Sequence, residues 1–559
     1  MNINKAHDGK EVIDTVCKAC AYGDFDKLKA FVELDPGCTN IPDENGYYPL
    51  QWAALNNRLA ETNFLIAQGV ALNVTDGTGQ TALHWAAVRG SLPVIETLLR
   101  SNADYEIKDN RGYTAIHVAA QYGQTSVLYH LALKWGVDMD QPDHDGRTPL
   151  HWAAYKGYAD TIRLLLVLDS RYDVGDKEGC TPLHWAAIKG NGEACTVLLQ
   201  GGSTSVLTSK DVTGLTPAQL ALEKGHRYLG LHLAEFKKKQ EGGGWFGKNG
   251  KLSWMVSTQL APLIVFYVTT MVVIFLKKVM PAHSMGPILS FFSWSVVVTS
   301  ALGFAFLYKT TTADPGFIPR GWDTYNSKRK DIDESSEEVD EESRIGGVVG
   351  GKGQHLLGHQ HKALDSPALW AGNWNQLCVS CRIVRPLRAK HCSVTDRCIE
   401  VFDHFCPWVG NAIGKGNRHY FLALLWLNLY AAVASSIIGM IQIQRFVHAD
   451  RLHPTTMVWL VSWLIINVFV ALGLAGLSVA QASQVARNVT TNELANWHRY
   501  QYLQASDGRF HNPFNNDCTS NCLEACAPFT APMAPVYMAK SSLGGRVSCK
   551  SNTFCRGCH

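Results

Sequence analysis

The stretches 79-GQTALHWAAVRG-90 and 146-GRTPLHWAAYKG-157 repeat one pattern, and this pattern decides the fold of the first part of the chain. Two further copies are 112-GYTAIHVAAQYG-123 and 179-GCTPLHWAAIKG-190, so the four begin 33, 34 and 33 residues apart. Turn residues precede a first helix, whose paired alanines let the partner helix approach closely. A glycine ends this helix, and a second apolar helix covers it. Because one such unit cannot bury its own core, the repeats predict a solenoid of stacked helix pairs over residues 41–236. Residues 1–40 read as a degenerate first repeat.

This repeat resembles the ankyrin repeat in its period and in its Thr-Pro-Leu-His-x-Ala pattern. The solenoid offers a concave surface for partner proteins. Tryptophan recurs at one repeat position, and packing between repeats is the alternative role for most of these side chains. The recurring residues are Trp52, Trp85, Trp152 and Trp185.

Four long runs almost free of charge follow the repeats, at residues 256–276, 287–308, 420–443 and 457–482. Each is long enough to cross a hydrocarbon core of about 30 Å, which takes about 20 helical residues. Buried helices of a large soluble core are the alternative. Lys and Arg gather on one side of the four runs, so the positive-inside rule places both termini in the cytosol. We therefore expect a multi-pass membrane protein that sits in a lipid bilayer.

The remaining boundaries follow from composition. We expect a linker at 237–255, two transmembrane helices within 256–309, a cytosolic loop at 310–377 with an acidic and glycine-rich disordered insertion, a cysteine-rich domain at 378–419, two more transmembrane helices within 420–482, and a cytosolic tail at 483–559. The fold class expected is all-α. The charge balance, with 51 Lys+Arg against 48 Asp+Glu, argues against a nucleic-acid partner.

The cysteine-rich segment carries a possible metal site. Cys378-x2-Cys381 is followed by His391 and then by Cys398. Three thiolates and one imidazole suit a tetrahedral structural Zn²⁺. The segment therefore predicts one zinc ion.

The same spacing can be tested again fourteen residues later, where it falls on Cys392, Thr395, Phe405 and Ala412. A single thiol cannot hold a structural zinc, so this second site is expected to be degenerate. We expect Phe405 and Ala412 to form an apolar plug in place of the metal.

Residues 378–421 resemble the Asp-His-His-Cys (DHHC) cysteine-rich domain of protein S-palmitoyltransferases, here with the variant signature Asp403-His404-Phe405-Cys406. Asp314-Pro315-Gly316, Thr490-Thr491-Asn492-Glu493 and Asn512-Pro513-Phe514 match further motifs of that family in the expected order. With the repeats ahead of it, the chain resembles the ankyrin-type members. This resemblance implies a groove that recruits membrane-associated substrate proteins, and Asn56 and Trp85 match the positions expected to dock their peptides.

The resemblance implies a protein S-acyltransferase that uses palmitoyl-CoA as the acyl donor and acts in the Golgi or another endomembrane. Cys406 would attack the thioester and become acylated, His404 would take its proton, and Asp403 would orient the imidazole. By the same resemblance, Thr491 would pack against Asp403, and Asn521 belongs to a packing motif of the tail. Arg388, with Lys390 and Arg418, is a candidate for the CoA phosphates, although a solvated basic face is an equal alternative for each.

The loss of the second histidine of the signature leaves one competing function. A catalytically inactive, membrane-tethered ankyrin adaptor would keep the same architecture. The intact set of Asp403, His404 and Cys406 favours the enzyme.

Overall fold

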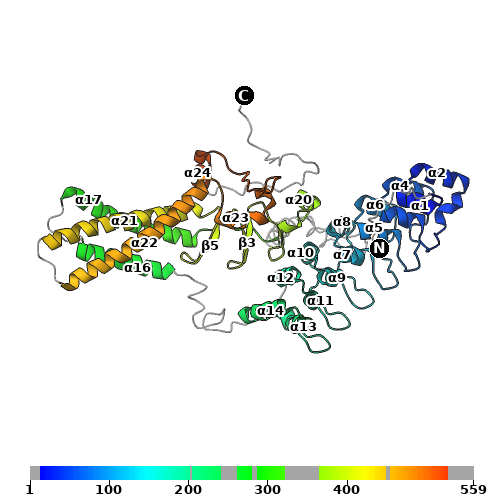
Figure 1. The fold of residues 1–559 in the computed structure, drawn as a ribbon, viewed down its shortest axis with the longest axis horizontal. Helices are drawn as coiled ribbons and strands as arrows, with labels where there is room; N and C mark the ends of the chain where they lie inside the picture. Colours follow the sequence, from blue (N-terminus) through cyan, green and yellow to red (C-terminus); the bar gives the residue numbers. More distant parts are fainter. Residues whose placement is uncertain are drawn as a thin grey trace, which may run out of the picture. The chain divides into compact units, whose positions relative to one another are not determined.

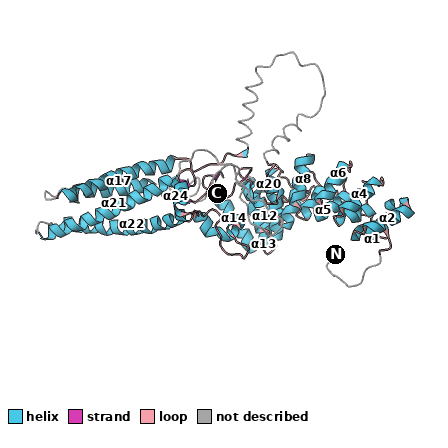
Figure 2. Ribbon diagram, turned by 90° about the horizontal axis from the view of Figure 1, so that it is seen from above, coloured by secondary structure: helices cyan, strands magenta, loops and turns pink. Residues whose placement is uncertain are grey.

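The computed structural model describes residues 13–201, 204–240, 261–279, 286–321, 364–448 and 454–526. The chain forms two compact units, one from the described parts of 1–240 and 325–384, the other from the described parts of 241–324 and 385–559. Helices dominate both units (Figures 1 and 2). The expected acidic and glycine-rich insertion lies outside the described residues. Each unit is described separately below.

The first unit is built from consecutive helix pairs that share one continuous apolar core (Figure 1). From the second pair onward, the first helix carries the repeated sequence pattern, and the second helix of each pair covers the first. The pairs are α1 (Val16–Tyr22) and α2 (Phe25–Leu34), α3 (Pro49–Leu55) and α4 (Leu59–Ala67), α5 (Ala82–Arg89) and α6 (Leu92–Arg100), α7 (Ala115–Gln121) and α8 (Thr125–Trp135), α9 (Pro149–Lys156) and α10 (Ala159–Val167), α11 (Pro182–Lys189) and α12 (Gly192–Gly201), and α13 (Pro217–Glu223) and α14 (Arg227–Gln240), with short 3-10 turns η1 (Pro36–Asn40) and η2 (Thr204–Leu207). The predicted ankyrin-like solenoid is confirmed.

The Thr-x-x-His part of the repeat forms a reciprocal helix cap. In α5 the Nδ1 of His84 accepts from the backbone N–H of the N-cap residue Thr81 at 3.2 Å. The other ring nitrogen, Nε2, lies 2.9 Å from the carbonyl oxygen of Tyr113 in the next repeat. One side chain therefore satisfies a helix terminus and joins two repeats, which explains why the histidine recurs with the period of the solenoid.

A segment that is distant in sequence completes the core of this unit. It contains α20 (Pro367–Trp370), the 3-10 turn η5 (Trp374–Gln376) and the antiparallel strands β1 (Leu377–Cys378) and β2 (Ile383–Val384). Leu364, Leu369, Trp374, Leu377 and Val379 are buried in the same apolar cluster as the repeat helices. The solenoid core therefore includes side chains from the loop between the second and third apolar runs.

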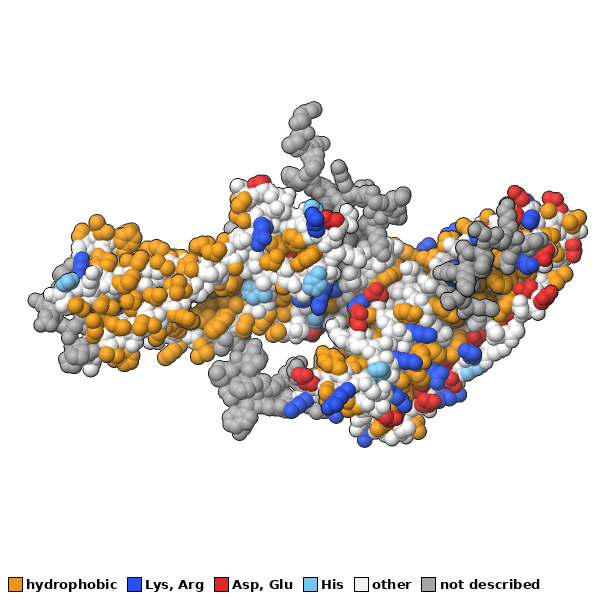
Figure 3. Space-filling model, viewed as in Figure 1, with side chains coloured by type: hydrophobic (Ala, Val, Ile, Leu, Met, Phe, Trp, Pro, Cys, Tyr) orange, Lys and Arg blue, Asp and Glu red, His pale blue; other side chains and the backbone are white. Residues whose placement is uncertain are grey.

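The second unit contains four helices long and apolar enough to cross a membrane. They are α16 (Ala261–Ile274), continued by the π-helical turn η3 (Phe275–Val279), α17 (Pro287–Thr312), α21 (Arg418–His448) and α22 (Pro454–Ala486). Figure 3 shows hydrophobic side chains spread over the surface of this region. The four predicted spans are confirmed. The third and fourth helices run several residues beyond the apolar runs at both ends, because backbone hydrogen bonding continues through polar residues.

Short antiparallel hairpins follow α17 in this unit and were not expected from the sequence. Strand β3 (Lys390–Cys392) pairs with β4 (Arg397–Ile399), and β5 (His404–Cys406) pairs with β6 (Asn411–Ile413). The Asp-Pro-Gly motif joins them to α17. The carbonyl oxygen of Asp314 lies so close to Gly416 that a Cβ there would come within 2.2 Å, so only glycine fits at position 416.

The end of the described chain packs against the end of the fourth long helix. It forms α23 (Thr491–Asn496), the 3-10 turns η6 (Trp497–Arg499) and η7 (Gln501–Leu503), and α24 (Cys518–Cys526). The buried Nδ2 of Asn521 donates to the carbonyl oxygen of Ala486, the last residue of α22, at 2.8 Å. This bond fixes α24 to the end of the fourth span.

Candidate active site

Strand β5 divides the signature between two environments. Successive side chains of a strand point to opposite faces, so His404 and Cys406 share one face and Phe405 lies on the other. His404 and Cys406 line a cavity of about 790 Å³ among the long helices. Phe405 instead packs with Cys392, Ile399 and Ala412. The thiol of Cys406 and the imidazole of His404 are thus neighbours on the strand face that opens toward the apolar helices.

A buried carboxylate holds the imidazole. Oδ2 of Asp403 lies 2.6 Å from Nδ1 of His404. Thr491 supports the same carboxylate twice, because its backbone N–H donates to Oδ1 at 2.7 Å and its hydroxyl donates to Oδ2 at 2.9 Å. With Nδ1 committed to the carboxylate, Nε2 is the ring nitrogen left for the thiol of Cys406.

The two titratable partners shift each other's pKa. Burial alone would lower the pKa of His404, but its interactions with Asp403 and Cys406 raise it to about 9. Burial alone would raise the pKa of Asp403, but the bond from His404, the charge of Arg418 and the Thr491 N–H lower it below the ordinary value. At neutral pH the pair is therefore an imidazolium and a carboxylate, and an imidazolium stabilises the charge of a neighbouring thiolate.

A donor set for a metal ion lies in the same segment of sequence. The ligand atoms of Cys378, Cys381, His391 and Cys398 all lie within 4.8 Å of one another. This is the set expected from the sequence, and three thiols with one imidazole fit a tetrahedral Zn²⁺. Strands β3 and β4 place two of the ligands directly opposite each other, since His391 pairs with Cys398.

The position of the second, degenerate set is occupied by apolar packing. Phe405 lies directly opposite Ala412 in the β5–β6 pair. Cys392, Phe402 and Ala412 are buried in the cluster against which Phe405 packs, together with Phe317 from the segment after α17. The structure therefore places the side chains of the expected plug in one apolar cluster.

The cavity has an apolar wall and two ends. Near Cys406, the buried cluster includes Leu307, Phe421 and Leu425. A second buried cluster further along the same helices contains Phe275 and Trp463. Both clusters contribute side chains to the cavity wall, so the cavity extends from the thiol into the hydrophobic part of the helices.

Comparison with known proteins identifies the family. Residues 373–498 match the model of the DHHC palmitoyltransferase family, and 16–109, 95–175 and 166–239 match ankyrin repeats. The chain is 37% identical over 544 residues to "Probable protein S-acyltransferase 23" of Arabidopsis thaliana, covering 94% of each protein. The chain belongs to the ankyrin-repeat DHHC palmitoyltransferase family. It is also 29% identical over 574 residues to "Palmitoyltransferase ZDHHC17" of Danio rerio, covering 91% of this chain and 86% of that protein.

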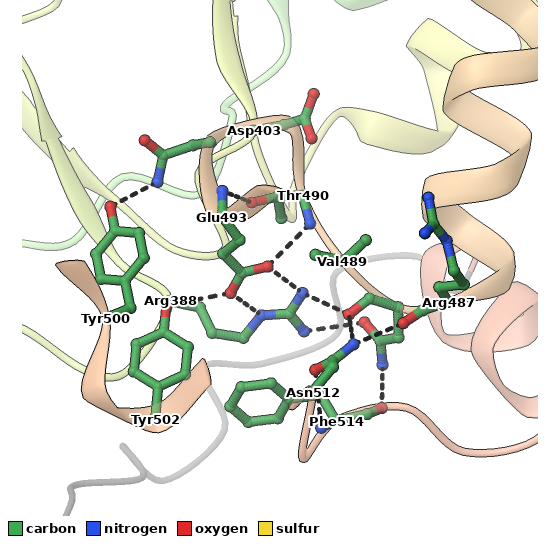
Figure 4. Close-up of polar contacts among 12 residues, drawn as sticks. Arg388, Asp403, Arg487, Val489, Thr490, Glu493, Tyr500, Tyr502, Asn512 and Phe514 are labelled. Carbon is green, nitrogen blue, oxygen red and sulfur yellow. Dashed lines mark hydrogen bonds and ion pairs between the residues drawn. The ribbon is translucent and has the colours of Figure 1, made fainter. Parts of the chain in front are cut away.

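This palmitoyltransferase uses Arg388 as a buried structural residue (Figure 4). The Nε and Nη2 groups of Arg388 donate to the two carboxylate oxygens of Glu493 at 2.8 and 2.9 Å. Nη1 donates to Oδ1 of Asn488, and the guanidinium lies 4.7 Å from the centroid of the Phe514 ring. Arg388 is 8% exposed, so its donors face protein groups in place of a CoA phosphate.

The other two basic candidates are also engaged. The ammonium of Lys390 donates to Oδ1 of Asn492 at 2.6 Å. Arg418 is buried, and its Nη2 donates to the carbonyl oxygen of Val489 at 3.3 Å. These contacts join strand β3 and the start of α21 to residues 489–493. Arg388 binds the same stretch, so all three cations hold in place the segment whose Thr491 donates to Asp403.

The two candidate docking residues lie on the first helices of neighbouring repeats. Nδ2 of Asn56 donates to the carbonyl oxygen of Trp52 at the end of α3. The indole N–H of Trp85 donates to Oδ2 of Asp76 in its own repeat loop at 2.8 Å. The corresponding tryptophans of three other repeats make the same bond, to Asp43, Asp143 and Asp176. The four indole rings are only half-buried, so part of each ring stays accessible despite this internal bond.

Sequence reasoning missed two glutamines behind the carboxylate. Gln481 lies on α22, and its Nε2 donates to the hydroxyl of Thr491 and to Oε1 of Gln484, both at 3.2 Å. The Thr491 hydroxyl itself lies 2.9 Å from both Oε1 of Gln484 and Oδ2 of Asp403, so the two glutamines belong to the hydrogen-bond network behind the carboxylate. Polar residues near the end of an apolar span are a recognised functional signal, and this signal could have identified both glutamines.

Proposed function

We propose that this palmitoyltransferase works through an acyl-enzyme at Cys406. The Cys406 thiolate attacks the thioester carbonyl of palmitoyl-CoA, a new S–C bond forms, and the CoA thiolate leaves and takes a proton. A substrate cysteine then attacks the Cys406 thioester and releases the enzyme thiol. His404 supplies and removes the proton through Nε2, and Asp403 stabilises its charged form. The observation that carries this proposal is the shared β5 face of His404 and Cys406, which opens onto the apolar cavity.

The cavity supports an acyl chain as the bound group. Its lining near the thiol and at its far end is mostly apolar, and an apolar chain gains about 0.8 kcal/mol for each CH₂ removed from water. A chain bound there would keep its thioester beside Cys406 at the cytosolic end of the helices. A palmitoyl donor fits this arrangement.

The metal set supports a single structural Zn²⁺ held by Cys378, Cys381, His391 and Cys398. The ion would fix the chain that leads into β3 and β4, and it takes no part in the acyl transfer. The apolar cluster around Phe405 supports an absence of metal from the second set. Elemental analysis of the pure protein should give about one zinc per chain, and a value of two would contradict the plug.

The solenoid supports recruitment of membrane-associated substrate proteins, with Asn56 and Trp85 as candidate contacts. We further propose that both termini face the cytosol of a Golgi or other endomembrane. This orientation puts the solenoid, Cys406 and the acyl-CoA on the same side. We also propose that the chain has no nucleic-acid partner, because 51 Lys+Arg are nearly balanced by 48 Asp+Glu.

The test is autoacylation of the purified, detergent-solubilised protein by labelled palmitoyl-CoA, beside Cys406→Ala. Hydroxylamine-sensitive label on the wild type and none on the variant would support the acyl-enzyme. Equal label on both would indicate passive acylation of other cysteines. No label on folded wild-type protein would favour the inactive adaptor.

A further inference from the structure

The loop segment 364–384 is built into the ankyrin solenoid and carries the first two ligands of the candidate metal set. We propose that the solenoid acts as the outer support of the metal site by holding the knuckle Cys378-Val379-Ser380-Cys381 in its binding geometry. The inference rests on the zinc site proposed above. It gives the repeats a second role, distinct from the recruitment of substrates.

The knuckle fits a notch at the end of α12. An added Cβ at Gly201 would lie 2.4 Å from Cγ1 of Val379 and 2.9 Å from Cδ1 of Leu166. Valine is stiff at χ1, so it cannot move away cheaply from such a Cβ. The absence of a side chain at position 201 therefore lets Val379, which stands between the two cysteines, reach the core of the solenoid.

Polar contacts fix the same knuckle from both sides. The hydroxyl of Ser380 donates to the carbonyl oxygen of Gln200 at 2.9 Å. Arg382, directly after the second cysteine, forms an ion pair with Asp169 at the end of α10. Both partners belong to the repeats, so the residues on either side of Cys381 are tied to the solenoid independently of the valine.

A buried tyrosine anchors the segment upstream of the knuckle. The hydroxyl of Tyr129 on α8 donates to the carbonyl oxygen of Leu364 at 2.7 Å. The rings of Trp370 and Trp374 stand edge-on to Tyr129, with centroids 4.7 and 5.2 Å away. Tyr129 is completely buried, so this contact is part of the core of the unit.

These contacts order the two thiols before a metal arrives. Ligand residues on a free loop would have to be ordered by the ion itself, and this cost would weaken its binding. Groups that support metal ligands typically change metal affinity by about 10- to 100-fold when they are altered. We therefore expect a disturbed notch to release zinc about 10-fold faster while the repeats remain folded.

The experiment compares Gly201→Ala with Gly192→Ala in the full-length protein. Both glycines lie on α12, and a Cβ at Gly192 would meet nothing within 4 Å. Zinc release to a chromogenic chelator is followed, and the alkylation rates of Cys378 and Cys381 in chelator-treated protein are read by mass spectrometry. Gly201→Ala should accelerate both rates, and Gly192→Ala should leave both at the wild-type value.

A second variant guards against an effect of folding alone. Tyr129→Phe keeps the ring and removes only the donor to Leu364, so it should raise the same two rates by a smaller factor. Far-UV circular dichroism checks that the repeats of each variant are folded. Unchanged zinc release and alkylation in both Gly201→Ala and Tyr129→Phe would overturn the proposal. Faster alkylation in a protein that carries no zinc would support the anchoring and refute the proposed metal instead.

Discussion

The far end of the cavity predicts how this enzyme chooses its acyl chain. Along α21 the cavity is lined from Phe421 to Ser435, and along α22 from Leu477 to Trp463. Each stretch advances fourteen residues, which is about 21 Å at a rise of about 1.5 Å per residue. An extended chain advances about 1.2 Å per bond. A palmitoyl thioester has about 16 bonds from the Cys406 sulfur to its last carbon and needs about 19 Å, whereas a stearoyl thioester has about 18 bonds and needs about 22 Å, so the cavity fits the shorter chain.

Trp463 closes that end, since it is only 3% exposed and packs with Phe275 in the buried cluster there. The two extra carbons of a stearoyl chain find no room in the wild type and lose about 1.6 kcal/mol, or roughly 15-fold. Trp463→Ala opens about one helical turn, or about 5.4 Å, below the present floor. The variant should therefore use stearoyl- and palmitoyl-CoA about equally.

The assay is competitive autoacylation with mixed acyl-CoAs, followed by mass spectrometry of the Cys406 peptide. Trp459→Ala is the matched control, because Trp459 lies one turn away on α22 and is 66% exposed. An unchanged ratio of stearoyl to palmitoyl label in Trp463→Ala would refute the reasoning. An equal change in both variants would refute it as well, because it would trace the effect to a general loosening of α22.

Three further predictions concern the support of the catalytic pair. Asp403→Asn removes the charge that raises the pKa of His404 to about 9. Without it, burial lowers this pKa, so the imidazolium is lost at a lower pH and the alkaline limit of autoacylation should move downward. Gln481→Leu removes the donor that orients Thr491 and should slow autoacylation by about 2- to 12-fold, the equivalent of one hydrogen bond, whereas Gln442→Leu, also buried on a long helix, should not. Arg388→Ala leaves half of a buried ion pair and should cost about 3–5 kcal/mol of unfolding free energy, read by denaturant titration.

Each of these predictions has an outcome that would count against it. An unmoved alkaline limit of autoacylation in Asp403→Asn would mean that the carboxylate does not control the charge of the imidazole. Equal autoacylation rates for Gln481→Leu and Gln442→Leu would mean that Gln481 contributes only by packing. Full rescue of the Arg388 site by lysine would contradict a requirement for bidentate pairing, which lysine cannot provide.

Much of this architecture could be predicted from local sequence. Three features can each be read within a short stretch of sequence. They are the period of the repeats, the lengths of the apolar runs and the spacing of Cys378, Cys381, His391 and Cys398. The packing of Phe405 against Ala412 followed from testing the ligand spacing a second time. In each case the residues that define the feature lie close together in the chain.

The features that escaped prediction depend on contacts between distant residues. Tyr129 and Leu364 are 235 positions apart, and no local pattern marks either as a partner of the other. The short hairpins escaped because strands of two or three residues show no alternation to read. Gln481 lies in a span that reads as membrane helix, and its role appears only when the turn after α22 brings Thr491 beneath it.

The alternation of strand β5 has a consequence for how the signature tetrad can vary. His404 and Cys406 face the cavity, whereas Phe405 belongs to an apolar cluster that holds the hairpins together. Position 405 is therefore exposed to selection for stability, while its two neighbours are exposed to selection for turnover. A metal ligand at position 405 could therefore be replaced by an apolar side chain during evolution without loss of activity, provided that positions 395 and 412 changed with it.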